Sequence, residues 1–179
     1  MEKQVMVAYA TKYGATGEIA EKIGQVLCQA GLRAEVLPAG GVNDLTSYDA
    51  VVLGSAVYMG KWRKEAVNFL QANEEALAEL LVWLFSSGPA GEGDPVELLD
   101  GWRFPEAQHT IADRIQPRDI AVFHGRVDVE KLNFIEKRMI KAVRSPVGDF
   151  RDWDAIISWA GSIADELKKA DSASGTQAE

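Results

Sequence analysis

Residues 4–30, QVMVAYATKYGATGEIAEKIGQVLCQA, decide the fold of this chain. Residues 5–10 are apolar without alternation, which is typical of a central parallel strand buried on both faces. Residues 17–30 carry apolar side chains at three- and four-residue spacing, which predicts an amphipathic helix. A strand joined to a helix by a short loop is the opening unit of an α/β fold.

The loop between these elements, residues 11–16, has threonines at both ends and a glycine, Gly14, that allows close backbone approach. A loop at a helix N-terminus offers free N–H groups and the positive end of the helix dipole, which suit a phosphate monoester. The alternative is a simple helix cap formed by Thr16. The loop contains neither G-x-G-x-x-G nor G-K-[ST].

Composition sets broader limits. The chain has 179 residues, of which 47% are hydrophobic and 26% charged, as expected for one globular domain with a substantial core. Its net charge of −8 argues against nucleic acid as a general partner. There is no apolar run of about 18 residues and no signal-peptide layout, so we expect a cytoplasmic location. Cys28 is the single cysteine and is expected in the core; we expect no disulfide and no metal site.

Strands and helices are predicted to alternate along the rest of the chain, which favours a parallel α/β sheet. Strands are expected at residues 33–37, 50–55, 81–85 and 119–125, and helices at residues 64–80, 102–115, 131–143 and 155–169. We expect one domain over residues 1–170, with a basic helical insertion at about 128–150. Residues 171–179 are small and polar and are expected to form a disordered tail.

Two further loops follow predicted strands, and ligands of open α/β sheets bind at the carboxyl ends of the strands. Residues 54–62 combine small residues with Tyr58 and Trp62, which either stack on a planar ring or pack as ordinary aromatics. Residues 86–95 are rich in glycine and proline. The three loops together predict a site for a phosphorylated planar ring. His124, at the end of the last strand, is expected to be a hydrogen-bonded structural residue.

The predicted helix at residues 131–143 is basic and amphipathic. Between Lys131 and Arg151 there are six basic and two acidic residues, a local charge of +4 that leaves −12 elsewhere. Such a helix either contacts an anionic membrane or an acidic partner, or packs on the domain with a solvated outer face.

With these loops placed, the chain resembles flavodoxin-like FMN proteins from Val5 to about Leu167, and most of all the menaquinone-dependent protoporphyrinogen oxidase branch. The resemblance rests on Gly14-Ala-Thr16, Gly54-Ser-Ala-Val-Tyr-Met-Gly60, Phe134-Ile-Glu-Lys-Arg-Met-Ile-Lys141 and Asp152-Trp153. It implies a three-layer sandwich in which helices cover both faces of a five-stranded parallel sheet, and FMN as the cofactor.

The resemblance also implies the residues of the site. The FMN phosphate would be held by Thr11, Lys12, Tyr13, Gly14, Ala15 and Thr16. The isoalloxazine would be flanked by Ser55, Ala56, Val57, Tyr58 and Gly60, and its other edge closed by Ser86, Ser87, Gly88, Pro89 and Gly91. We predict no catalytic side chain, and we expect few cations near the cofactor, which would disfavour an anionic reduced flavin.

Three functions are compatible with this sequence. The first is an FMN-dependent oxidoreductase that takes electrons from a reduced substrate, a porphyrinogen by the resemblance, and passes them to a quinone. In that case the helix at 131–144 would make a peripheral contact with the inner face of the membrane. The second is a flavodoxin-type single-electron carrier between soluble redox partner proteins. The third is an FMN-binding module without turnover. The oligomeric state stays open.

Overall fold

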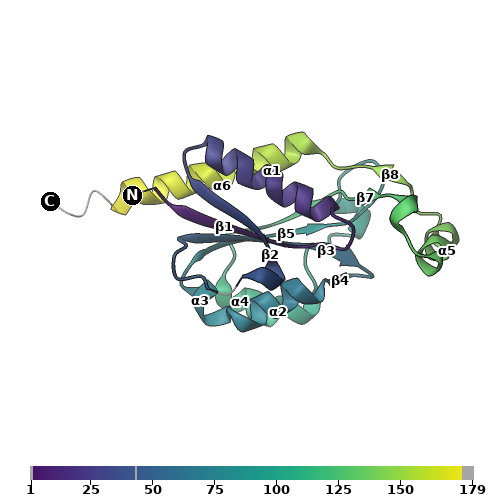
Figure 1. Cartoon of the computed structure of the whole chain (residues 1–179), viewed down its shortest axis with the longest axis horizontal. Helices are drawn as coiled ribbons and strands as arrows, with labels where there is room; N and C mark the ends of the chain where they lie inside the picture. The colour runs from purple at the N-terminus through teal and green to yellow at the C-terminus, as the bar shows by residue number, and fades with distance from the viewer. Residues whose placement is uncertain (1, 43, 175–179) are drawn as a thin grey trace.

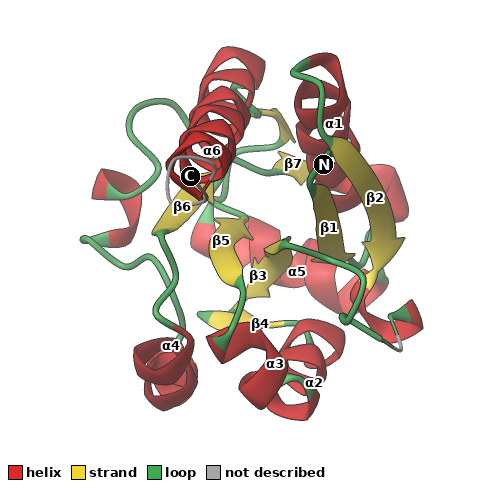
Figure 2. Cartoon of the chain, turned by 90° about the vertical axis from the view of Figure 1, so that its left-hand side faces the viewer, coloured by secondary structure: helices red, strands yellow, loops and turns green. Residues whose placement is uncertain are grey.

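The structure, a computed structural model, describes residues 2–42 and 44–174, without the side chains of residues 171–174. Its centre is a parallel sheet in the order β2-β1-β3-β5-β6 (Figure 2). These strands are β1 (Gln4–Ala10), β2 (Arg33–Pro38), β3 (Ala50–Tyr58), β5 (Leu81–Ser87) and β6 (Asp119–Phe123). A short strand, β4 (Lys61–Trp62), pairs antiparallel with the end of β3 and was not predicted. The predicted parallel sheet is confirmed.

Helices cover both faces of the sheet, as expected (Figure 1). One face is covered by α1 (Ala15–Gln29) and α6 (Trp153–Ser174), and the other by α2 (Lys64–Ala72), α3 (Glu74–Ala78) and α4 (His109–Ile115). Single 3-10 turns lie at Ala39–Gly41, Glu97–Leu99, Glu106–Gln108 and Val129–Lys131.

The unbroken apolar run of β1 reflects burial on both sides. Val5 and Val7 pack with the residues of α1 and α6, whereas Met6 and Ala8 pack with those of α2. In β3, Gly54 is required by close packing, because a Cβ atom there would lie 1.9 Å from Cζ of Phe85. Both faces of β1 are therefore apolar.

Several local predictions need correction. The helix expected at residues 64–80 is divided at Asn73, whose side-chain Nδ2 donates to the carbonyl of Phe69 at 2.9 Å. Helix α6 continues through Ser174, so the start of the expected disordered tail is helical, while residues 175–179 lie outside the described residues. Cys28 is exposed, because it lies one position, or about 100°, beyond the buried Leu27 on α1.

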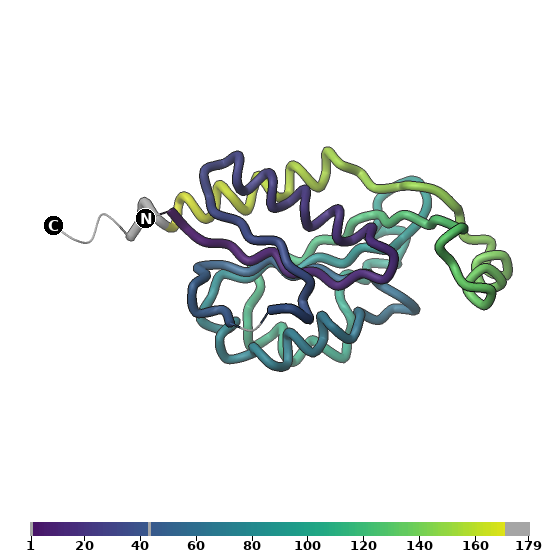
Figure 3. Tube along the Cα trace, viewed as in Figure 1, coloured from purple at the N-terminus to yellow at the C-terminus, as the bar shows by residue number. Residues whose placement is uncertain are grey.

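A second, two-stranded sheet lies between β6 and α6, where the chain leaves the main body of the domain and returns to it. Strands β7 (Arg126–Val127) and β8 (Gly148–Asp149) pair antiparallel, with Arg126 opposite Asp149. Between them, residues 128–147 form what we call the α5 segment, which contains helix α5 (Phe134–Val143). Figure 3 shows this segment projecting from the end of the molecule where the parallel strands have their carboxyl ends. Across the described residues, the search for a helix that is long and apolar enough to span a membrane finds none.

Candidate cofactor site

The first loop leaves the N-terminus of α1 open. Gly14 is the N-cap residue with φ of 93°, a left-handed conformation that favours glycine, and its N–H donates to Oγ1 of Thr11 at 3.0 Å. Among the residues that the structure describes, no side chain caps the helix, and Thr16 lies buried inside it, so the Thr16 cap does not form. The first intrahelical bond runs from the N–H of Glu18 to the carbonyl of Gly14, at 3.1 Å. The N–H groups before it have no partner within the helix and can bind an anion.

The three strand-end loops meet around one cavity of about 120 Å³. Among the predicted site residues, its lining includes Thr11, Tyr13, Ala15, Thr16, Ala56, Val57, Tyr58, Ser87 and Gly88. The loop after β6 and the α5 segment complete it with Gly125, Arg126, Val127, Asp128, Lys131, Leu132 and Ile140. The structure therefore brings the three loops together, as the sequence predicted. The α5 segment lies over the cavity between them, which the sequence did not predict.

The residues present fit FMN. The open N-terminus of α1 and the threonine hydroxyl groups suit the phosphate, and the position of a Cβ atom on Gly14 has no heavy atom within 4 Å. Tyr58 lines the cavity and is 39% exposed, so the site reaches the surface beside an aromatic ring that can stack on the flavin. The cavity is smaller than the roughly 300–1,000 Å³ of typical ligand sites, so bound FMN would extend beyond it at this open side.

Trp62 does not lie at the cavity, which corrects its expected stacking role. It is 5% exposed, packs edge-on against Phe104 at 4.8 Å, and donates from Nε1 to Oγ of Ser86 at 2.8 Å. Ser86 is buried and in turn donates to the carbonyl of Arg103 at 2.9 Å. Ser55 is also buried, and its Oγ accepts from the N–H of Arg63 at 2.9 Å. Buried hydrogen bonds of Trp62, Ser86 and Ser55 therefore hold the second and third loops in place.

The remaining predicted residues shape the loops without lining the cavity. Gly60 and Gly91 occupy left-handed turn positions, with φ of 70° and 126°. His124 lies between two carbonyl groups, with Nδ1 3.1 Å from the carbonyl oxygen of Pro89 and Nε2 2.7 Å from that of Gly93. The buried imidazole of His124 thus fastens the third loop to the end of β6, in the structural role expected of it.

Lys12 points toward α5. Its Nζ forms an ion pair with Glu136 and lies 5.1 Å and 5.6 Å from the ring centroids of Tyr13 and Tyr58. The hydroxyl of Tyr13 also donates to Glu136. Burial raises the pKa of Glu136, but hydrogen bonds from Lys12, Tyr13 and the N–H of Asn133 outweigh it and lower the pKa to about 2. A hydrogen bond to Glu136 likewise raises the pKa of Lys12.

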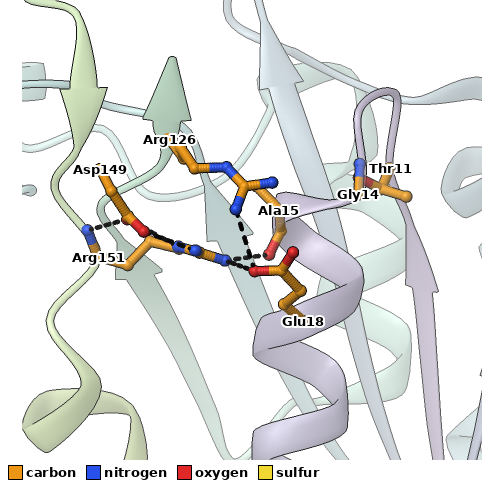
Figure 4. Close-up of polar contacts among 7 residues, drawn as sticks. All are labelled: Thr11, Gly14, Ala15, Glu18, Arg126, Asp149 and Arg151. Atoms are coloured by element: carbon orange, nitrogen blue, oxygen red, sulfur yellow. Dashed lines mark hydrogen bonds and ion pairs between the residues drawn. The ribbon is translucent and has the colours of Figure 1, made fainter. Parts of the chain in front are cut away.

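A second polar cluster joins the base of the α5 segment to the first turn of α1 (Figure 4). Arg151, whose side chain is 3% exposed, donates to Asp149 through Nε at 2.8 Å and Nη2 at 2.7 Å. Its Nη1 donates to Glu18 at 2.5 Å and to the carbonyl of Ala15 at 3.3 Å. Hydrogen bonds from Arg151 lower the pKa values of both Glu18 and Asp149.

The expectation of few cations near the cofactor was wrong, because Arg126 and Lys131 both line the cavity. The signal was available: Arg126 follows the last predicted strand directly, and the carboxyl ends of parallel strands meet at one edge of the sheet. Across the described residues, there is no group of three or more histidine, cysteine, aspartate or glutamate side chains that could hold a metal ion.

Known structures share this fold. An archaeal flavodoxin aligns over 92% of this chain and 99% of its own, with 15% identity and a TM-score of 0.60. A flavodoxin from Streptococcus pneumoniae aligns over 93% of this chain and 99% of its own, with 16% identity and a TM-score of 0.55. Rubredoxin oxygen:oxidoreductase from Desulfovibrio gigas aligns over 93% of this chain but 36% of its own, with 14% identity and a TM-score of 0.60.

At these identities the structures establish the fold. No curated protein matches the chain significantly. A protein-family model described as a flavodoxin domain matches residues 6–154, which is most of the sequence and includes all three loops of the site. The chain therefore belongs to the flavodoxin-domain family, and this membership implies FMN as its cofactor.

Proposed function

We propose that this protein is an FMN-dependent oxidoreductase that works against an anionic membrane surface and passes electrons to a quinone dissolved in that membrane. The observation that carries the proposal is the exposed apolar surface of α5. The side chains of Phe134, Ile135 and Val143 are 73%, 70% and 71% exposed, and Met139 is 45% exposed. None of the ten residues of this helix is buried.

Basic side chains surround this apolar face. Arg138 lies against the ring of Phe134, with its guanidinium carbon 5.9 Å from the ring centroid, and Lys141 and Arg144 follow on the exposed surface. Apolar residues beside cations on one helix are the pattern of a helix that lies in the interface of an anionic bilayer. Exposed apolar patches of this kind mark interaction surfaces.

The same segment also covers the cofactor cavity. Lys131, Leu132 and Ile140 line the cavity, while Glu136 contacts the first loop through Lys12 and Tyr13. Bound FMN supplies the ability to accept and release electrons. Because one short segment lines the cavity and also carries the exposed apolar residues, its contact with a bilayer would hold the cavity close to a quinone dissolved there.

The resemblance to the protoporphyrinogen oxidase branch supports a porphyrinogen as the electron donor. That support comes from Gly54–Gly60 and from Phe134–Lys141, the second of which is α5 itself. The second candidate is a single-electron carrier between soluble proteins, which the family match and the net charge of −8 favour. A carrier of that kind has no use for the exposed apolar face of α5.

The first test uses vesicles. We expect the FMN-loaded protein to sediment with vesicles that contain phosphatidylglycerol and not with pure phosphatidylcholine vesicles. The double variant Arg138→Glu/Lys141→Glu should bind about 30-fold more weakly or worse, since each basic residue near such a surface contributes about 1 kcal/mol. The matched control, Lys22→Glu/Lys64→Glu, makes the same charge change on α1 and α2 and should bind normally. Equal binding of the two double variants would remove the membrane from the proposal.

A second test separates the two functions. The flavin is reduced chemically without oxygen and mixed with vesicles that contain menaquinone, and its reoxidation is followed by absorbance. We expect reoxidation to be faster with anionic vesicles than with neutral ones, and slow in the Arg138→Glu/Lys141→Glu variant. A flavin that stays reduced with either kind of vesicle, yet is reoxidised by a soluble redox protein, would favour the carrier.

A further inference from the structure

We infer that Arg126 is a ligand of the FMN phosphate: it exchanges its contact with Glu18 for the phosphate ester when the cofactor binds. The inference needs only the cofactor and does not depend on the proposed membrane contact or quinone. It assigns to the loop after β6 a part in selecting phosphorylated flavin, whereas the residues expected to hold the phosphate, Thr11 to Thr16, all lie in the first loop.

The position of Arg126 is the first argument. It begins β7, three residues after the end of β6, and its side chain is 23% exposed. It lines the same cavity as Thr11, which follows β1, and as Ala15 and Thr16, the first residues of α1. Figure 4 shows the Arg126 side chain lying beside the first turn of α1, near Ala15 and Glu18. The guanidinium group is therefore held next to the place where an anion would bind.

The present bonding of Arg126 is the second argument. Within the part of the chain that the structure describes, its side chain makes one hydrogen bond, from Nη1 to Oε2 of Glu18 at 3.3 Å. That distance is at the long end for an N–H···O bond. Arg151 holds the same Glu18 oxygen at 2.5 Å. Glu18 thus keeps a strong partner when Arg126 leaves, and a guanidinium with five N–H donors has most of them free for a new acceptor.

Charge balance is the third argument. Two other cations near the first loop are engaged, because Lys12 pairs with Glu136, and the buried Arg151 makes a two-pronged contact with Asp149. Lys131 also lines the cavity but lacks the planar fork of a guanidinium group. A phosphate at the N-terminus of α1 would lie close to the carboxylate of Glu18 in the first turn of that helix. Arg126 is the cation in this cluster that can turn toward the phosphate and offset the repulsion. Its planar fork suits two phosphate oxygens at once.

The test compares two ligands that differ only in the phosphate. Protein without bound cofactor is titrated with FMN or with riboflavin, and the quenching of flavin fluorescence gives each dissociation constant. Arg126→Gln should raise the Kd for FMN about 10- to 100-fold, the range of charge-assisted hydrogen bonds, and leave the Kd for riboflavin unchanged. Arg126→Lys, which keeps the charge but not the fork, should recover part of the loss. Increasing salt should weaken FMN binding more steeply in the wild type than in Arg126→Gln.

Arg118→Gln is the matched control, because Arg118 is also an arginine paired with a glutamate, Glu166 at 3.6 Å, but does not line the cavity. We expect it to leave the preference for FMN over riboflavin close to that of the wild type. The inference is overturned if Arg126→Gln weakens both ligands equally, which is the sign of a merely structural role. It is also overturned if the preference is lost instead in Lys131→Gln, since Lys131 is the other cation that lines the cavity. Should Arg126→Gln not fold, Arg126→Lys serves alone: an FMN affinity equal to that of the wild type would then overturn the inference.

Discussion

Helices α1 and α5 have the same spacing of apolar residues and opposite burial. In α1, the apolar residues Ile19, Ile23 and Leu27 are fully buried against the sheet and α6. In α5, Ile135, Met139 and Val143 have the same spacing and are 70%, 45% and 71% exposed. Amphipathic spacing therefore identifies an apolar face that packs against something, but it does not identify the packing partner. The protein's own core packs against the apolar face of α1, whereas none of the described residues buries the apolar residues of α5.

The two helices also begin differently, in keeping with this contrast. Helix α1 starts at Gly14 without a side-chain cap, so its first N–H groups can serve a phosphate. Helix α5 starts with a capping box, in which Oδ1 of Asn133 accepts from the N–H of Glu136 at 2.9 Å and Oε2 of Glu136 accepts from the N–H of Asn133 at 3.0 Å. A buried helix can leave its end open for a ligand, whereas an exposed helix needs the cap for its own stability.

The largest expected effect tests the difference in burial. Ile23→Ala in α1 should lower the free energy of unfolding by about 2–5 kcal/mol, because it leaves a cavity in a closed core. Its matched partner, Ile135→Ala in α5, should change that free energy by less than about 0.5 kcal/mol, because the side chain is exposed. Urea unfolding followed by circular dichroism measures both. If the two variants cost the same, α5 is covered in solution and the contrast fails.

A smaller effect tests the cap. Asn133→Ala should cost about 1 kcal/mol, within a range of roughly 0.5–2, and the loss should be confined to α5. Amide hydrogen exchange, which reports local opening, should then be faster in residues 134–143 than in α1. Lys137→Ala, also in α5 but outside the cap, is the control and should leave this exchange almost unchanged. Uniformly faster exchange across the protein would mean that α5 and the core open together.

The smallest effect concerns pH and the contact between α5 and the first loop. Because the pKa of Glu136 is lowered from 4.5 to about 2, this contact contributes fully above pH 4.5 and is lost as the pH falls toward 2. Low pH should therefore release α5 from Lys12 and Tyr13, which a carbon NMR titration of the Glu136 carboxyl group can follow. The variant Glu136→Gln should lack this pH dependence. A carboxyl group that titrates near its ordinary value would show that the contact does not form.

The strands were predictable because burial on both faces leaves an unmistakable apolar run, as in Val5, Met6, Val7 and Ala8. The meeting of the three loops was predictable for a related reason: parallel strands put their carboxyl ends at one edge. Tyr58 and Trp62 could not be told apart, since both are aromatic residues just after a strand. What separates them is the reversal into β4, which pairs Trp62 with Val57 and turns its indole toward Ser86.

The cover of the cavity was not predictable in the same way. The contact between Lys12 and Glu136 joins residues 124 positions apart, and that between Arg126 and Glu18 joins residues 108 positions apart. No local periodicity encodes such pairs. The basic, amphipathic character of residues 131–143 was visible in the sequence, but one helix can equally turn its apolar residues inward or outward. The contacts of Glu136 with the first loop decide the question, since they direct Phe134 and Ile135 to the surface.

The pairing of β7 with β8 has a consequence for the history of the molecule. Because Arg126 lies opposite Asp149 and Val127 opposite Gly148, the chain leaves and re-enters the body at adjacent points. Residues 128–147 can then be shortened, lengthened or exchanged for another sequence while a tight hairpin joins the same two ends, and no sheet strand has to move. A family that keeps one cofactor could acquire new partners by replacing the α5 segment alone. Transfer of this segment to a relative that lacks it is a practical route to redesign.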